Sequence, residues 1–457
     1  MALEVLVPVT TEVIELNPAC VIDGKSEDGR IIIRLDARKQ DHRKRLGLCA
    51  DTPIHFGSSR VIEVQELSGL GWPLCYEVTT ADGWYVNEYG QRCWFTPELE
   101  GISLRRGVSW VVMRAAVLLA IIAGIGVRRA AWLLGILFHV TISKSSVDRW
   151  IGEVAQTLPS ADELVKELNR RQPIGEGHLD ELFANGGDKP CLLVFRDEHG
   201  RIVASEELKS RDEAHVKPFL HRLKGLGLAV RVFYIDHCKA YKNAIEAVYP
   251  EAVIQYDYFH IIQNIWRHLW RYFVSHRKQV KERSEKVKTP WYSAQLQQLA
   301  TTLWKKRYLI FKAEENMTEE EKAQLASIME VDLKVSRLRA FMQGVWDMFN
   351  QSQDEADAKR ALEAIKEQAI EAKAKPTLEK IHTFLDDNFD QMITYLKIPG
   401  VQRNSLAETG MRTLRRLEQG HDGFRSPQGR QDALRIYQAV KYLGWTVHHP
   451  PDLFSVG

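Results

Sequence analysis

The stretch Val230-Arg-Val-Phe-Tyr-Ile-Asp236 is typical of a short buried strand that ends in a carboxylate. A second run, Gly177-His-Leu-Asp-Glu-Leu-Phe183, contains Asp180, which we expect to end a separate strand. Strand ends of an α/β sheet usually present functional side chains, and the order of elements permits these two strands to lie side by side. Asp180 and Asp236 are therefore candidates to share metal ions. For either Asp taken alone, a turn or capping role is the simpler interpretation.

The sequence around both runs predicts a mixed α/β layer. We expect strands at 190–196, 201–208 and 252–256, and helices at 212–226, at 239–248 and from Tyr258 onward. This order, βββαβαβα, is that of a sheet covered by helices. The fold class predicted for the whole chain is multidomain, α/β plus α.

Bulk composition excludes few function classes. The chain of 457 residues suggests two to four domains, and its 62 basic and 60 acidic side chains give a net charge of +2, which indicates no particular partner. The six cysteines form no C-x-x-C pair, so we expect reduced thiols in a cytoplasm. The apolar window 110–127 contains Arg114 and favours a buried helix, with a membrane segment as the minority interpretation.

Residues 1 to 100 alternate β-forming residues with turn signals such as Asp28-Gly29, which predicts a β-rich domain. After Pro97 the pattern becomes helical, with candidate helices at 127–137 and 143–156 and Ser143 as an N-cap. This spacing fits a helix-turn-helix in which the second helix enters a major groove, and equally a plain structural hairpin. The candidate DNA-binding residues here are Arg128, Arg129, Lys144, Ser145, Ser146 and Arg149.

A third carboxylate, Glu408, opens a helical stretch far downstream. On a helix it shares a face with Arg412, Arg415 and Arg416, which would place a metal-binding carboxylate beside phosphate-binding guanidiniums. An ordinary Glu/Arg surface pair is the alternative. Three carboxylates are hard ligands that favour Mg²⁺ or Mn²⁺, and two such ions roughly 4 Å apart could clamp an in-line phosphoryl displacement.

Other chemistries lack their signatures. The sequence contains no G-x-S-x-G, no H-E-x-x-H and no G-x-x-x-x-G-K-[ST], which argues against serine hydrolases, zincins and P-loop enzymes.

Several motifs occur together between Gly175 and Tyr442. The block Tyr249–His260 follows Asp236 and contains Asp257-x-x-His260; a long helical insertion leads to Asn404-Ser-Leu-Ala-Glu408; and Gly423-Phe-Arg425 comes after it. In this combination the chain resembles the DDE transposases of bacterial insertion sequences, most closely the ISL3 type and its Mutator-like relatives. One departure is the N-terminus, which lacks the C-x-x-C of the zinc-binding element found in many ISL3-type proteins.

The resemblance implies an RNase H-like core whose catalytic and metal-binding carboxylates are Asp180, Asp236 and Glu408, with Asp257 and His260 as structural residues near the site. His260 would hydrogen-bond Asp257 or simply pack on a helix. The implied cofactor is a pair of Mg²⁺ or Mn²⁺ ions. The implied domains are a β-rich domain (1–100), a helix-turn-helix domain (101–172), the first part of the core (173–265), a helical insertion (266–400) and the C-terminal helical part of the core (401–457).

The implied function is that of a transposase that binds the terminal inverted repeats of an insertion sequence, cleaves DNA and transfers strands. Its partners would be double-stranded DNA, at the transposon ends and the target, and a second copy or more of itself, without a membrane. The expected location is a bacterial cytoplasm, with nucleoid association on DNA. Two alternatives stay open: a domesticated DNA-binding protein without catalysis, and an RNase H-like nuclease without strand transfer.

Overall fold

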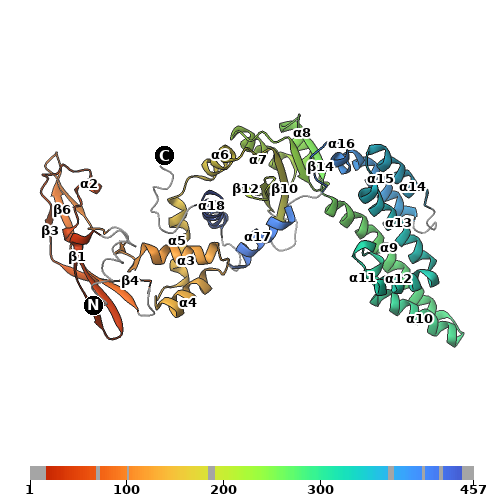
Figure 1. Cartoon of the computed structure of the whole chain (residues 1–457), viewed down its shortest axis with the longest axis horizontal. Coiled ribbons are helices and arrows are strands. Elements are labelled where there is room, and N and C mark those ends of the chain that lie inside the picture. The colour runs from red at the N-terminus through yellow and green to blue at the C-terminus, as the bar shows by residue number, and fades with distance from the viewer. Residues whose placement is uncertain are drawn as a thin grey trace. The chain divides into compact units, whose positions relative to one another are not determined.

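The computed structural model describes residues 17–67, 73–99, 102–183, 191–368, 375–403, 407–420 and 426–444 (Figure 1). Within these ranges, the side chains of Ser103, Phe183, Lys375, 407–411, Gln419 and Gly420 are left out of the description. The chain forms two compact units, one of residues Met1–Arg171 with Gly410–Gly457 and the other of Gln172–Thr409.

The first unit begins with a six-stranded sheet. Its order is β1 (Val21–Glu27), β2 (Arg30–Asp36), β5 (Leu74–Thr80), β4 (Arg60–Glu66), β9 (Val108–Ser109), β8 (Ile102–Ser103). The predicted turn at Asp28-Gly29 joins β1 to β2, and both residues have positive φ, 50° and 72°, as a tight hairpin turn requires. The prediction of short strands in this region is confirmed.

A smaller three-stranded sheet lies in the same region. It has the order β3 (His55–Phe56), β6 (Gly83–Val86), β7 (Arg92–Phe95). Short helical turns flank both sheets: η1 (Pro18–Cys20), η2 (Ala37–Lys39) and α2 (Arg43–Leu46).

Five longer helices complete the first unit. They are α3 (Trp110–Ile121), α4 (Val127–Phe138), α5 (Lys144–Gln156), α6 (Ala161–Arg171) and α18 (Pro427–Leu443). The hydroxyl of Ser109 caps α3 by accepting from the amide of Val112. No helix within the described ranges is both long and apolar enough to cross a bilayer, and the window around Arg114 forms the partly buried α3 instead.

The second unit is built on a mixed five-stranded sheet. Its order is β12 (Ile202–Leu208), β11 (Cys191–Arg196), β10 (Glu176–Phe183), β13 (Val232–Ile235), β14 (Val253–Tyr256). β10, β11 and β12 are antiparallel neighbours, whereas β13 and β14 run parallel to β10. The helices α7 (Glu213–Gly225) and α8 (Lys239–Val248) connect the strands and lie beside the sheet (Figure 1). The predicted order of strands and helices is confirmed.

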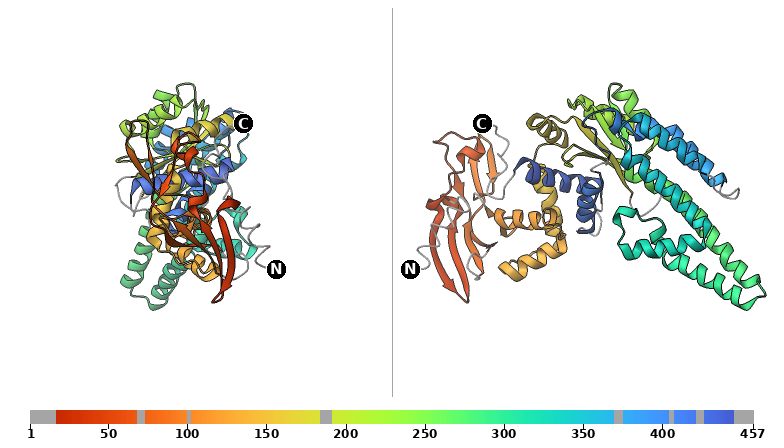
Figure 2. Two further views of the ribbon diagram at one scale, coloured as in Figure 1. Left: turned by 90° about the vertical axis from the view of Figure 1, so that its left-hand side faces the viewer. Right: turned by 45° about the vertical axis from the view of Figure 1, so that its right-hand side comes forward.

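Helices form the rest of the second unit, and no described residue between 266 and 400 lies in a strand. The 29-residue α9 (Tyr258–Lys286) is followed after a three-residue connection by α10 (Pro290–Lys305), which runs back along it (Figure 2). The remaining helices of this unit are α11 (Arg307–Ile310), η4 (Glu314–Asn316), α12 (Glu319–Val331), α13 (Leu333–Gln351), α14 (Glu355–Glu367), α15 (Lys375–Met392) and α16 (Thr394–Lys397). A further helix, α17 (Ala407–Gly420), begins in the second unit, and its residues from Gly410 onward belong to the first.

Candidate active site

Two neighbouring strands place Asp180 and Asp236 on one face of the sheet. The parallel register pairs His178 of β10 with Tyr234 of β13, and their rings stack with centroids 4.4 Å apart. Because alternate residues of a strand point to the same face, the residues two positions further along each chain lie beside one another on that face. Those residues are Asp180 and Asp236. Asp236 directly follows β13 as predicted, whereas Asp180 lies inside β10 and not at its end, because the strand continues to pair with β11 as far as Phe183.

Backbone amides orient the two carboxylates. The amide of Glu181 donates to Asp180 Oδ1 at 2.8 Å, and the amide of Cys238 donates to Asp236 Oδ1 at 3.0 Å. Burial raises the pKa of Asp180, and the adjacent Glu181 adds to the rise. Burial likewise raises the pKa of Asp236, to which the charge of Asp180 contributes. Burial thus disfavours the charged form of each carboxylate, and a cation bound near them would stabilise that charged form.

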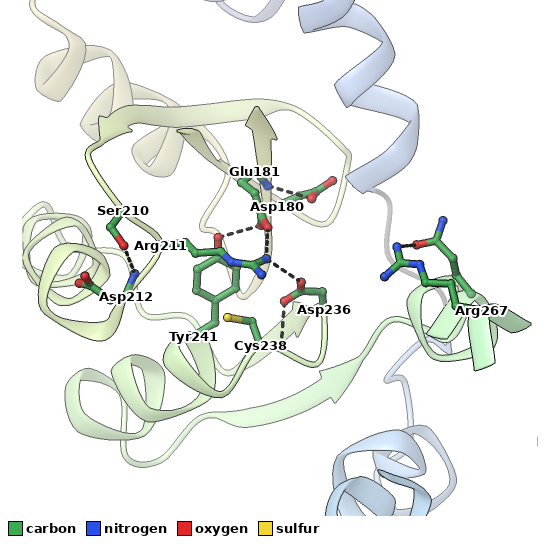
Figure 3. A network of polar contacts seen from close by, with 10 residues as sticks. Asp180, Glu181, Ser210, Arg211, Asp212, Asp236, Cys238, Tyr241 and Arg267 are labelled. Carbon is green, nitrogen blue, oxygen red and sulfur yellow. Dashed lines mark hydrogen bonds and ion pairs between the residues drawn. The ribbon is translucent and has the colours of Figure 1, made fainter. Parts of the chain in front are cut away.

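Three further residues join this site that the sequence did not indicate (Figure 3). The guanidinium of Arg211 donates to Glu181 Oε1 at 2.9 Å and lies 4.0 Å from Asp236 Oδ2. The hydroxyl of Tyr241, on α8, donates to the other oxygen of Glu181 at 2.7 Å. Burial and the charge of Asp236 raise the pKa of Glu181 despite these contacts. Arg211 thus lies between two carboxylates, with 51% of its side chain exposed.

The start of α9 contributes Asp257 and His260. Asp257 is buried and caps the helix, since its Oδ1 accepts from the amide of Phe259 at 2.8 Å. His260 lies one turn further on. Burial raises the pKa of both Asp180 and Asp236, and the positive charge of His260 partly opposes that rise. The structure gives Asp257 a capping role.

After the helical insertion the chain returns to the same sheet. The side-chain amide of Gln255, on β14, is buried. Its nitrogen donates to the backbone carbonyl of Met392 at 3.1 Å, and its oxygen accepts from the backbone amide of Tyr395 at 2.9 Å. The hydroxyl of Thr394 donates to the carbonyl of Ile254 at 2.7 Å. Beyond them, the backbone amide of Gln402 donates to the hydroxyl of Tyr234 at 2.9 Å. The segment that leads to Glu408 is thus anchored on the strands that carry the site.

Glu408 lies on α17, but its side chain is outside the described residues, as are Asn404–Leu406 and 423–425. On the same helix Arg412, Arg415 and Arg416 are partly or fully exposed, and Leu414 and Leu417 are buried. Among the side chains that the structure describes, no group of three or more His, Cys, Asp or Glu is arranged to hold a metal ion.

The candidate DNA-binding residues of the first unit lie on α4 and α5. Ser143 caps α5 by accepting from the amide of Ser146 at 3.1 Å, as predicted. Lys144, Ser145 and Arg149 are exposed on α5, and Arg128 and Arg129 are exposed at the start of α4. His139, with φ of 57°, ends α4 and turns the chain toward α5.

Comparison with known proteins gives one family. The profile of the ISL3-type DDE transposases, described as "Transposase", matches residues 178–429, more than half of the chain. No curated protein sequence matches. Among solved structures, the chain is similar to one titled "Drosophila P element transposase strand transfer complex", with 12% identity and a TM-score of 0.33 over 74% of this chain and 92% of that one. A TM-score of this size does not establish a shared fold.

Proposed function

The chain belongs to the ISL3-type family of DDE transposases, and we propose that it binds the terminal inverted repeats of an insertion sequence, cleaves DNA there and transfers the strands to a target. Asp180, Asp236 and Glu408 are its catalytic carboxylates. The family membership supports a role in transposition and DNA as the partner. The chemistry and its residues are our proposal.

One observation carries the assignment. Asp180 lies on β10 and Asp236 directly follows the adjacent parallel strand β13, each two residues beyond the stacked His178–Tyr234 pair. The chain then returns from the insertion to Tyr234 itself, through the amide of Gln402. Glu408 is six residues beyond Gln402, and six residues extend at most about 20 Å. This distance supports a third carboxylate near the first two.

The order and directions of the five strands support an RNase H-like core. In this assignment the core comprises residues 173–265 and 401–457, interrupted by a helical insertion at 266–400. A helix-turn-helix domain at 101–172 and a β-rich domain at 1–100 precede it.

The donor set fits divalent cations. Asp180 and Asp236 offer hard oxygen ligands. Burial disfavours the charged forms of these carboxylates, and a bound cation would offset that effect. Two Mg²⁺ or Mn²⁺ ions would be held by these residues and Glu408. When bound, such ions polarise a phosphodiester and lower the pKa of water or of a 3′-hydroxyl.

The remaining residues of the site bind and orient. Arg211, fixed by Glu181 and half exposed, is placed to contact a phosphate beside Asp236. On the first unit, Arg149, Lys144 and Ser145 of α5 would contact the terminal repeat, with Ser146, Arg128 and Arg129 beside them. Arg412, Arg415 and Arg416 would contact phosphates. Because two ends are cleaved, the active form would be a homodimer or a larger assembly on DNA. The proposed location is a bacterial cytoplasm.

The test uses inverted repeats taken from the DNA that flanks the gene. The protein is incubated with a labelled terminal-repeat duplex, a target plasmid and Mn²⁺. Cleaved ends together with joined products are expected. Binding without cleavage would instead identify a domesticated DNA-binding protein, and cleavage without joining would identify a nuclease.

A further inference from the structure

The small sheet of the first unit carries a row of aromatic rings across its three strands. The antiparallel register pairs His55 of β3 with Trp84 of β6, and Trp84 with Trp94 of β7. The rings of His55 and Trp84 stack with centroids 4.1 Å apart, and those of Trp84 and Trp94 are 6.5 Å apart. Directly paired residues share a face, so the three rings form one continuous row.

The opposite face of this sheet is packed. Phe56 and Phe95 make an edge contact there with centroids 6.2 Å apart, and the buried ring of His42 packs against both. Gly83 is required at this position, since a Cβ on it would lie 2.4 Å from the ring of Phe95. Packing on this side fixes the sheet, and the aromatic row lies on its other face. The small sheet, with β3 and β6, lies at one end of the β-rich region (Figure 1).

Arg92 lies over the aromatic row. Its guanidinium carbon is 4.2 Å from the ring centroid of Trp84 and 6.0 Å from that of Trp94. Arg92 is also the one formally charged residue among the ten that form β3, β6 and β7. Trp94 is 63% exposed, and His55 and Arg92 are exposed as well. The face therefore offers flat rings and a positive charge to solution.

We propose that the face formed by His55, Trp84, Arg92 and Trp94 binds single-stranded DNA. Any unpaired base can stack on an exposed aromatic ring, whatever the DNA sequence, and a neighbouring cation attracts the phosphates. The four residues of this face include no carboxylate, so nothing in the row repels the phosphates of a nucleic acid. The family to which the chain belongs acts on DNA, which makes DNA the expected ligand. This site is separate in sequence from the carboxylates, and its binding requires neither metal nor cleavage.

The test measures the binding of a fluorescein-labelled 15-nucleotide oligo-dT to the full chain by anisotropy, in EDTA. Replacing Trp94 with Leu keeps the apolar bulk but removes the aromatic face, so affinity should fall about tenfold, within the range for loss of one stacked base. Trp94→Phe should bind nearly as the unchanged protein does, and Arg92→Ala should bind more weakly. Trp291→Leu, on α10, is the matched control because Trp291 is 65% exposed.

Equal affinities for Trp94→Leu and Trp94→Phe would overturn the proposal, and so would an equal loss in Trp291→Leu. A second measurement replaces one thymine with 5-iodouracil and maps the photocrosslink, which should fall at His55 or within 83–95. Crosslinks only elsewhere contradict it. A duplex of the same length that competes as well as the single strand would also exclude stacking on unpaired bases. Neither the anisotropy nor the photocrosslink requires cleavage, so both measurements still test this proposal if the protein does not cleave DNA.

Discussion

The backbone amide of Gln402 donates to the hydroxyl of Tyr234 at 2.9 Å, although 168 residues separate them in the chain. Tyr234 is fully buried, and its ring stacks on His178 while its hydroxyl holds the returning segment. One side chain thus connects the two strands of the candidate site to the segment that leads to Glu408. The long insertion is accommodated because both of its ends meet the same edge of the sheet.

Replacing Tyr234 with Phe should lower the rate of cleavage at saturating DNA roughly tenfold. The change keeps the stacked ring but leaves the amide of Gln402 without this acceptor, at a cost of about 1–3 kcal/mol. The segment before Glu408 then loses its fixed position. Single-turnover cleavage measures the effect, and duplex affinity should stay within about threefold. Tyr249→Phe is the control, and unchanged cleavage in Tyr234→Phe would show that the anchor does not position the site.

Arg211→Ala should lower cleavage roughly 100-fold, the scale for removing one preorganised charged donor from a reacting group. Arg211→Lys should recover only part of the rate, because an ammonium cannot donate in the planar geometry of a guanidinium. Single-turnover rates measured at several DNA concentrations separate the effect on the cleavage step from the effect on DNA binding. Arg222→Ala is a suitable control, since Arg222 pairs with Glu206 on β12. If Arg211→Ala cleaves like Arg222→Ala, Arg211 does not contact the phosphate.

The strands that carry Asp180 and Asp236 were predictable because apolar runs bounded by turn residues are local signals. The cap at Ser143 is local in the same way, and the structure contains it. Glu181, Arg211 and Tyr241 were missed because they come from β10, from the loop between β12 and α7, and from α8, with no spacing that relates them. The role of Gln255 was equally hidden, since its amide bonds to residues 137 and 140 positions away. Such contacts exist only after the chain has folded.

Arg149→Ala should reduce affinity for the terminal repeat about tenfold and relax its sequence preference, if Arg149 contacts a base edge. Lys144→Ala should weaken repeat and random duplexes alike, and should reduce the slope of log affinity against log salt by about one. Titrations at several salt concentrations measure both. Arg170 on α6 is the matched control, with 65% of its side chain exposed against 62% for Arg149. Equal losses in Arg149→Ala and Arg170→Ala would exclude α5 as the recognition helix.

The helical insertion should lose stability in acid through Asp332. Burial alone would raise the pKa of this carboxyl, but hydrogen bonds from His276 and from the amides of Val335 and Lys334 lower it. A depressed pKa means that the stabilisation is complete above the unfolded value near 3.9 and is lost as the pH falls through the folded value. Unfolding curves between pH 7 and pH 2 measure the loss.

Two substitutions separate the roles of Asp332. Asn still caps α13 but carries no charge, so Asp332→Asn should cost about 1–3 kcal/mol at pH 7, and the cost should shrink as the pH falls from 4 to 2. Asp332→Ala should cost about 1 kcal/mol more at each pH, because the cap is lost as well. A difference between the unchanged protein and Asp332→Asn that stays constant from pH 4 to pH 2 would show that charge is not the cause.

The central claim is that Asp236 belongs to a metal-dependent site for DNA cleavage. The direct measurement compares the unchanged protein, Asp236→Asn and the control Asp354→Asn, whose Asn still caps α14, on a labelled terminal-repeat duplex in Mg²⁺ or Mn²⁺. We expect cleavage by the unchanged protein and by Asp354→Asn, none by either in EDTA, and no cleavage but near-normal duplex binding by Asp236→Asn. An Asp236→Asn protein that still cleaves the repeat would contradict the assignment.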